Sequence, residues 1–139
     1  QGYTQFGGQR PFGVSFLYAG WDRHYGFQLY QSNPSGNYGG WKATAIGPNN
    51  QAASSLLKKE YEDDCSIDDA LKLAVKVLNK TMDTVTPSPE NMEFSVLKMD
   101  DSTKKLIQHV MTNDEVQALL DVIQQEEAEE RAAEEAKAA

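Results

Sequence analysis

The sequence predicts an α+β fold in which a strand-rich first part precedes two helices, a short hairpin and a last helix. Three observations support this prediction. Between residues 10 and 47, runs of Val, Phe, Tyr, Trp and Ile alternate with clusters of Gly, Pro, Asn and Asp, as in consecutive antiparallel strands and their turns. Residues 49–61 and 66–78 carry apolar side chains at helical spacing. Residues 93–123 then suggest strand, turn, strand and helix.

The first part is expected to form three antiparallel strands, which are Val14–Ala19, Phe27–Gln31 and Trp41–Ile46. Glycines at both ends permit a turn over residues 20–26. A second turn is expected over residues 32–40, where Pro34 and Gly36 have suitable backbone preferences. The third strand is partly apolar on both sides, so we expect it to be covered on both faces.

Two amphipathic helices are expected next. Asn49 or Asn50 can cap the first, and the acidic run over residues 60–64 ends it. Ser66 and Asp69 form a capping box for the second, in which the serine hydroxyl accepts a backbone N–H. Packed as an antiparallel pair, the helices would cover one face of the sheet. The second helix carries an apolar stripe of Ile67, Ala70, Leu71, Ala74 and Leu78, widened by Val75 and Val77.

The remaining elements follow a proline-containing break at Thr84–Glu90. A hairpin is expected from Glu93–Met99 and Leu106–Met111. The last helix begins at Thr112, which forms a second capping box with Glu115. Its buried face should consist of Val116, Leu119, Leu120 and Ile123.

The chain is expected to contain one domain over residues 1–125 and an acidic solvated tail over residues 126–139. The tail has strong helix formers but only alanine to bury, so it should be a frayed solvated helix or a disordered arm. At the other end, the chain opens on Gln1 without an initiating Met, and Gly7 and Gly8 resemble the stop after a helix. We therefore expect that the sequence was cut from a longer parent.

Composition argues against several classes of partner. A net charge of -8 and a pI near 4.7 disfavour nucleic acid and anionic membrane surfaces, which bind Lys and Arg. No apolar run approaches the ~20 residues of a membrane span. Cys65 is the only cysteine, so no intrachain disulfide can form, which suits a reducing compartment. We expect a cytoplasmic or nuclear protein.

Candidate metal and nucleophile residues do not combine into a site. Asp22, His24 and the distant His109 lack the spacing of zinc ligands. Cys65 lies among aspartates, which would raise rather than lower the pKa of a thiol. The sequence predicts no catalytic residue and no metal site.

Two further motifs are also interpreted as structural. Gly36, Gly39 and Gly40 precede a predicted strand, whereas a phosphate-binding loop opens a helix and carries a lysine. Asn79-Lys80-Thr81 matches the glycosylation pattern but falls in a predicted helix. We expect no cofactor. As an unrelated binding module, the chain would use its acidic tail as an arm for basic partners.

Several short motifs, taken in order, resemble the alpha subunits of the proteasome core particle. They are Arg10-Pro11-Phe12-Gly13, Gly20-Trp21-Asp22, Leu29-Tyr30, Asn33-Pro34-Ser35-Gly36, and Trp41-Lys42-Ala43 through Ile46-Gly47. Residues 5–8 and 39–42 look most like one particular type of alpha subunit. The similarity extends up to the acidic tail, but corresponds only to about the C-terminal half of a family member.

This resemblance implies an N-terminal nucleophile hydrolase fold, a four-layer αββα sandwich of which this chain supplies an incomplete C-terminal half. It implies a non-catalytic structural subunit of the alpha ring that contributes to assembly, controls substrate access and docks regulatory caps in ubiquitin-dependent protein degradation. The implied partners are other alpha subunits, beta subunits, and ATPase or activator caps. Gly47-Pro48-Asn49-Asn50 stands where active beta subunits carry a serine-rich turn.

Two points qualify the resemblance. Asn33 replaces the aspartate usual before Pro-Ser-Gly in alpha subunits, although both residues make similar side-chain turns. The enzyme alternative is a catalytic N-terminal nucleophile hydrolase whose nucleophile lies in the missing N-terminal half. Because the family's first strands lie upstream of Gln1, the chain alone should expose strand edges and be marginally stable.

Overall fold

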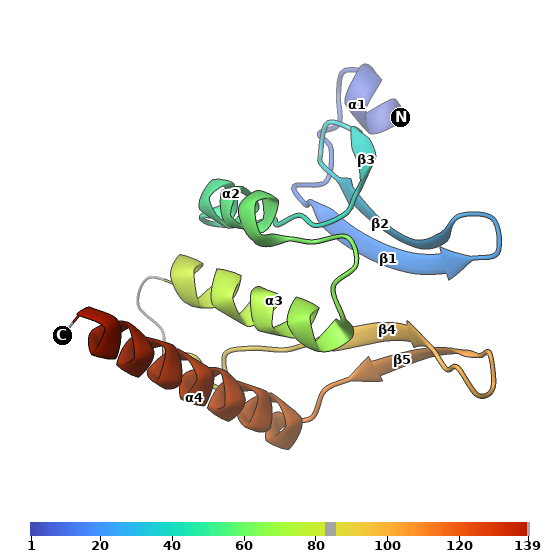
Figure 1. The fold of residues 1–139 in the computed structure, drawn as a ribbon. Coiled ribbons are helices and arrows are strands. Elements are labelled where there is room, and N and C mark those ends of the chain that lie inside the picture. The colour runs from blue at the N-terminus through green and yellow to red at the C-terminus, as the bar shows by residue number, and fades with distance from the viewer. Residues whose placement is uncertain (83–85, 139) are drawn as a thin grey trace. The chain divides into compact units, whose positions relative to one another are not determined.

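The computed structural model describes residues 1–82 and 86–138, which fall into two compact units, Gln1–Cys65 and Ser66–Ala139 (Figure 1). Each unit contains both helices and antiparallel strands, in agreement with the predicted α+β class. The single domain expected over residues 1–125 stays a prediction. No helix of the described residues combines the length and apolarity needed to cross a membrane.

The first unit contains a three-stranded antiparallel sheet in the order β1-β2-β3. Its elements are α1 (Gly2–Gln5), β1 (Phe16–Asp22), β2 (Gly26–Ser32), β3 (Tyr38–Trp41) and α2 (Asn50–Glu60). The short helix α1 ends before Gly7 and Gly8, as expected, and Gly8 has a φ of 102°. The second predicted strand is confirmed and extends by one residue at each end.

The first predicted strand was wrong at both of its ends. β1 begins two residues later than Val14 and continues through Gly20 and Trp21, which had been assigned to the turn. The reason is the side chain of Asp22, whose Oδ1 accepts hydrogen bonds from the backbone N–H groups of His24 and Tyr25, both at 2.7 Å. This closes the turn within three residues, and the strands remain paired up to Asp22 and Gly26.

The third predicted strand was also wrong, since β3 ends where that strand was expected to start. The turn closes over residues 33–37, where the N–H of Asn33 donates to the Asn37 carbonyl at 3.1 Å and Gly36 adopts a φ of 87°. β3 therefore begins at Tyr38, three residues before the predicted strand. Gly40 pairs with Tyr30 of β2, and a Cβ at this position would lie 3.7 Å from Tyr30 Cε1, an ordinary van der Waals distance. Residues 42–46 leave the sheet, so the expected two-sided cover does not apply to them.

Helix α2 confirms the first predicted helix, but not its cap. Asn49 occupies the N-cap position with a left-handed φ of 59°, and its side chain makes no capping hydrogen bond. Asn50 Nδ2 instead donates to the Gly47 carbonyl at 2.7 Å. The expected pairing of this helix with the next one stays a prediction, because the two helices belong to different units.

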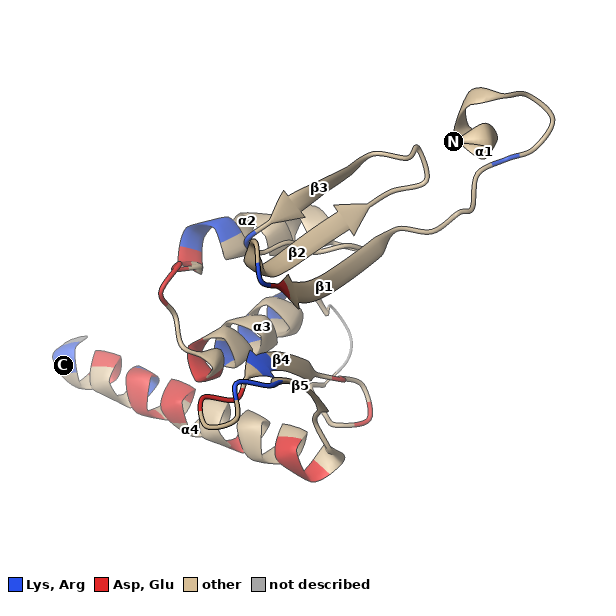
Figure 2. Ribbon diagram, turned by 90° about the vertical axis from the view of Figure 1, so that its right-hand side faces the viewer, with Lys and Arg blue, Asp and Glu red and all other residues tan. Residues whose placement is uncertain are grey.

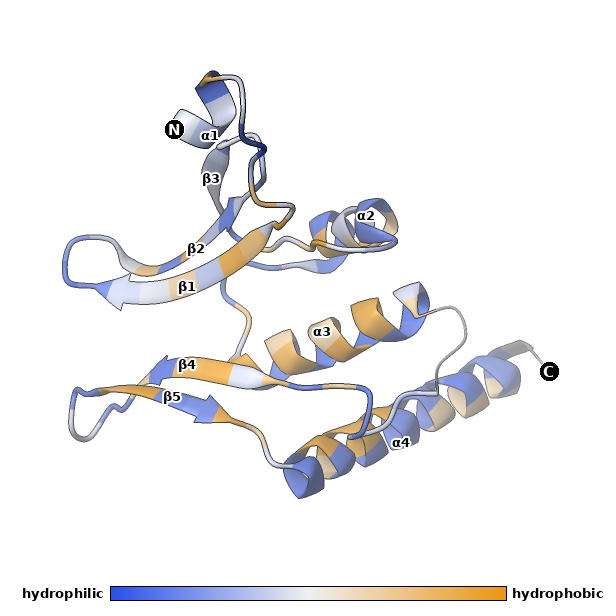
Figure 3. Cartoon of the chain, turned by 180° about the vertical axis from the view of Figure 1, so that it is seen from behind, coloured by the Kyte–Doolittle hydropathy of each residue, from blue (hydrophilic) through white to orange (hydrophobic). Residues whose placement is uncertain are grey.

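The second unit is built from two helices and a hairpin (Figures 1 and 3). Its elements are α3 (Ile67–Thr81), β4 (Ser95–Met99), β5 (Leu106–Val110) and α4 (Asn113–Ala138). The predicted hairpin is confirmed. The expected break at Thr84–Glu90 falls partly outside the described residues, and residues 86–94 form no helix or strand. The core of the unit consists of Val75, Met92, Phe94, Val116, Leu120 and Ile123.

Both predicted capping boxes are present. Ser66 Oγ accepts from the backbone N–H of Asp69 at 3.1 Å, and the Asp69 carboxylate accepts from the Ser66 N–H at 3.3 Å. The Thr112 N–H donates to Glu115 at 2.7 Å, and the Glu115 N–H donates to Thr112 Oγ1 at 3.3 Å. These bonds satisfy backbone donors that a helix start leaves without an intrahelical partner.

Removing the first cap should destabilise the second unit. We expect Ser66→Ala to lower its free energy of unfolding by about 1 kcal/mol, the usual effect of losing an N-cap serine. The measurement is the urea midpoint followed by far-UV circular dichroism. Ser66→Asp keeps a side-chain acceptor and should retain most of the stability, and an equal loss in both variants would contradict the capping explanation.

The acidic tail is the exposed end of α4. The helix continues to Ala138, and the side chains over residues 124–137 are exposed, which matches the solvated-helix alternative rather than the disordered arm (Figure 2). Lys72 of α3 donates a hydrogen bond to Glu126 at 2.5 Å. Glu126 lies beyond Ile123, the last buried residue of α4. A further pair, Glu127 and Arg131, lies along the helix at 3.6 Å.

The turn between β4 and β5 contains Asp100, a carboxyl group whose pKa is strongly lowered. Hydrogen bonds from the Ser102 and Thr103 hydroxyls, and from the Ser102 N–H, lower the pKa of Asp100 from its usual 3.8 to about 2. A carboxyl group whose pKa is lower in the folded state contributes stability above its unfolded pKa of about 3.9, and this contribution disappears as the pH falls through the folded value.

Acidification should therefore weaken the hairpin between about pH 4 and pH 2. We expect Asp100→Asn to reduce the pH dependence of stability in this window, measured as the urea midpoint at a series of pH values. Asp101→Asn is the matched control, because the Asp101 side chain is fully exposed and forms an ion pair with Lys104 at 3.9 Å. An unchanged pH profile in Asp100→Asn would contradict this assignment.

Candidate functional site

The residues considered as metal ligands have structural roles instead. Asp22 closes the β1–β2 turn, and the N–H of Tyr25, the Gln28 amide and the N–H of His24 lower the pKa of its carboxyl group. His24 Nε2 accepts from Arg23 Nε at 3.3 Å in the same turn. His109 belongs to β5 in the other unit. Within residues 1–82 and 86–138, no group of three or more His, Cys, Asp or Glu residues could hold a metal ion.

His109 makes a contact that the sequence did not reveal. Its Nε2 lies 3.0 Å and 2.9 Å from the two carboxylate oxygens of Glu115, the residue that completes the α4 capping box. The N–H of Thr112 and the His109 side chain both lower the pKa of Glu115. The histidine thus joins the end of β5 to the first turn of α4.

The remaining candidates also serve the fold. Cys65 is a half-buried free thiol whose backbone N–H donates to the Glu62 carbonyl at 3.3 Å. Gly39 and Gly40 lie inside β3, so they form no loop at the start of a helix. Thr81 of the glycosylation pattern donates to the Val77 carbonyl at 2.9 Å within α3.

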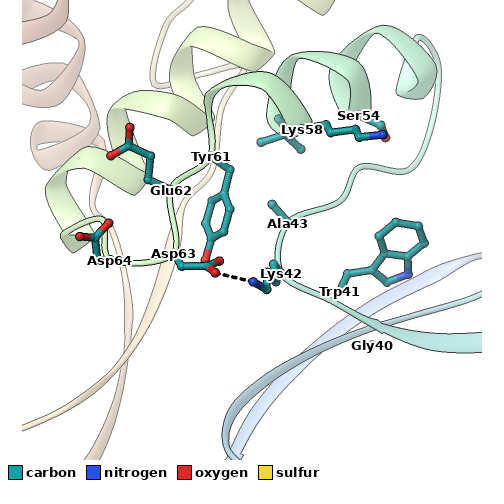
Figure 4. Close-up of a pocket in the computed structure, with 11 residues that line it drawn as sticks. Gly40, Trp41, Lys42, Ala43, Ser54, Lys58, Tyr61, Glu62, Asp63 and Asp64 are labelled. Atoms are coloured by element: carbon teal, nitrogen blue, oxygen red, sulfur yellow. Dashed lines mark hydrogen bonds and ion pairs between the residues drawn. The ribbon is translucent and has the colours of Figure 1, made fainter.

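An open pocket of about 770 Å³ in the first unit was not predicted (Figure 4). It lies between residues 40–43 at the end of β3 and Ser54, Leu57 and Lys58 of α2, and residues 61–64 complete its wall. Lys42 donates a hydrogen bond to Asp63, and the ring of Tyr61 stands beside this pair. The ion pair joins the chain after β3 to the chain after α2.

The charges of this pocket suit binding better than acid–base chemistry. The hydrogen bond to Asp63, together with the charge of that carboxylate, raises the pKa of Lys42. Lys42 therefore stays an ammonium group at neutral pH and cannot act as a general base. Ala43, Leu57 and the ring of Tyr61 give the pocket apolar walls. Such a hollow can receive a side chain of another polypeptide.

Comparison with known proteins gives a consistent result. A family model described as "Proteasome subunit" matches residues 1–97. Proteasome subunit alpha type-4 of Spinacia oleracea is 68% identical over 95 residues, which cover 68% of this chain and 38% of the relative. The alpha type-4-A subunit of Arabidopsis thaliana is 57% identical over 120 residues, covering 86% of this chain and 48% of the relative.

A third relative matches a larger share of the chain. A probable proteasome subunit alpha type-3 of Schizosaccharomyces pombe is 49% identical over 125 residues, or 90% of this chain and 50% of the relative. The chain thus spans half or less of the length of these relatives. The subunit type singled out by residues 5–8 and 39–42 is alpha type-4, the type that the spinach and Arabidopsis proteins are named for.

Proposed function

Since the chain belongs to the proteasome subunit family, as the match over residues 1–97 shows, we propose that it is a non-catalytic structural subunit of the alpha ring of the proteasome core particle. The observation that carries the proposal is the 68% identity over 95 residues to an alpha type-4 subunit. The family expected from the ordered motifs is confirmed.

In this role the chain contributes to ring assembly, to the control of substrate access and to the docking of regulatory caps in ubiquitin-dependent protein degradation. Its partners are other alpha subunits at the sides, beta subunits on one face, and ATPase or activator caps. A location in the cytoplasm and nucleus belongs to the same proposal. The free Cys65 supports it, because reducing compartments keep thiols unpaired.

We propose the four-layer αββα sandwich of N-terminal nucleophile hydrolases as the fold of the whole domain. Two separate antiparallel sheets, of three and two strands, support this architecture. The three-stranded sheet also carries exposed aromatic residues. These residues support the sandwich architecture, because a sandwich buries the inner face of each sheet. The chain would supply part of each layer.

The catalytic alternative is less favoured. The relatives reported above are named alpha type subunits. Residues 47–49 form an irregular connection into α2, with a positive φ at Gly47 and at Asn49, and residues 47–50 contain no serine. In this stretch the chain departs from the serine-rich turn that the family resemblance implies for active subunits.

Analysis of the mature amino terminus tests the non-catalytic assignment. We expect an N-terminus that is not a processed Thr, Ser or Cys, and no covalent labelling of this chain by a reagent that reacts with N-terminal threonine nucleophiles. An active beta subunit from the same preparation serves as the positive control. A processed nucleophilic residue that becomes labelled would establish the catalytic alternative instead.

A further inference from the structure

The helix α4 continues beyond the core that supports its first half. Ile123 is its last buried residue, and the side chains of residues 124–137 are exposed. Residues 126–137 contain six glutamates but only one arginine and one lysine. Several of these glutamates lie three or four positions apart, a spacing at which like charges destabilise a helix. Burial therefore does not account for the helical start of the acidic tail.

An ion pair between two helices lies at this point. The core around Val75 and Leu120 brings α3 against α4 (Figure 1), and Lys72 Nζ donates a hydrogen bond to Glu126 Oε1 at 2.5 Å. The two partners are 54 positions apart, and both belong to the second unit. Their side chains are 35% and 48% exposed, so water screens this pair less than a fully exposed one. The contact lies within this unit and does not require a sheet face to remain exposed.

Lys72 supplies the compensating charge between α3 and the start of the acidic tail. The hydrogen bond to Glu126 raises the pKa of Lys72, and the charges of Glu126, Asp69 and Asp68 also raise it. Both aspartates lie in the first turn of α3. Without the ammonium group, these aspartates and Glu126 would repel one another, because all three carry negative charges.

Contacts within the tail cannot replace this ion pair. Gln125 Nε2 donates to Glu129 at 3.2 Å, and Arg131 pairs with Glu127 at 3.6 Å. Each contact joins residues four positions apart on α4, so it forms only where the helix already exists. The ion pair to Glu126 differs, because its donor belongs to another helix. It can therefore hold the first turn of the tail from outside.

We propose that Lys72 is an electrostatic anchor that holds the first turn of the acidic tail against α3. With the ion pair formed, the tail continues from Ile123 as an ordered helix. When salt or a competing cation breaks the pair, the tail frays back toward Ile123. The anchor thus sets where the rigid part of α4 ends. This conformational device belongs to the chain itself and goes beyond its role in the ring.

Amide hydrogen exchange of the 139-residue chain at low ionic strength tests the proposal. We expect Lys72→Met, which keeps an apolar stem but no charge, to accelerate exchange over residues 124–138 by about two- to fivefold. Exchange over residues 116–123 should not change, because Val116, Leu120 and Ile123 belong to the core. Equal exchange of the tail in Lys72→Met and the wild type would overturn the proposal.

Glu126→Gln and Glu130→Gln form a matched pair of variants. Both remove one carboxylate from α4, and Glu130 lies one helical turn beyond Glu126. Glu126→Gln should accelerate exchange of the tail, whereas Glu130→Gln should leave it unchanged or slow it, because it removes only repulsion. Combining Glu126→Gln with Lys72→Met should accelerate exchange no further than Lys72→Met alone, since both changes break one interaction.

Salt provides a second readout, which loss of packing alone would not move. The ratio of tail exchange rates between Lys72→Met and the wild type should fall toward one between about 20 and about 500 mM NaCl, because salt screens the pair. A ratio that does not change with salt, or equal acceleration by Glu126→Gln and Glu130→Gln, would overturn the proposal. Glu126→Gln lies on the exposed tail and decides the question even if Lys72→Met fails to fold.

Discussion

Replacing Leu120 by alanine should lower the free energy of unfolding of the second unit by roughly 2–4 kcal/mol. The Leu120 side chain is 3% exposed and belongs to the cluster that joins α3, α4 and the segment before β4. The substitution removes buried methyl groups and leaves a cavity beside Val75 and Phe94. Urea denaturation followed by far-UV circular dichroism measures the loss.

Val122→Ala is the control for this prediction, because Val122 lies on the same helix but is 46% exposed. We expect a change of less than about 0.5 kcal/mol, as for most surface substitutions. If both variants lost the same stability, the loss would not depend on burial, and the assignment of the core would be contradicted.

The 139-residue chain alone should unfold over a broad thermal transition rather than a sharp one. Eight apolar side chains are buried among the described residues, whereas eighteen large apolar ones are exposed. The sheet of β4 and β5 has only two strands, and sheets of this size are marginal by themselves. The free energy of unfolding should therefore lie below the usual ~5 kcal/mol.

Differential scanning calorimetry at low protein concentration provides the measurement. A sharp cooperative melt of a monomeric chain would contradict the expectation of marginal stability.

Local signals in the sequence accounted for α2, α3 and α4 and for the caps of the latter two. Ser66 and Asp69 are three positions apart in the sequence, as are Thr112 and Glu115. The structure contains the capping hydrogen bonds of both pairs. The hairpin of β4 and β5 was also predicted because a polar turn separates two apolar runs. Such features depend on neighbouring residues, so the pattern of the sequence suffices to locate them.

The strand boundaries could not be predicted in the same way. Gly39 and Gly40 disfavour a strand by propensity, yet pairing with Gln31 and Tyr30 includes them in β3. The end of β1 depends on hydrogen bonds that Asp22 accepts across the turn. In both cases contacts beyond local propensity decide the boundary.

The pocket was missed for a related reason. Lys42 and Asp63 are separated by 21 positions, and their pairing depends on how the chain after β3 meets the chain after α2. His109 and Glu115 meet through the connection between β5 and α4.

Gradient sedimentation of the tagged protein from cells tests the central claim most directly. A structural subunit of the alpha ring should co-migrate with other proteasome subunits in a ring-sized assembly far larger than a dimer. Val116→Asp, which places a charge at a position only 1% exposed, should remove the protein from this assembly, while Glu134→Gln on the exposed tail should not. A wild-type protein that migrates only as a monomer or dimer would contradict the account.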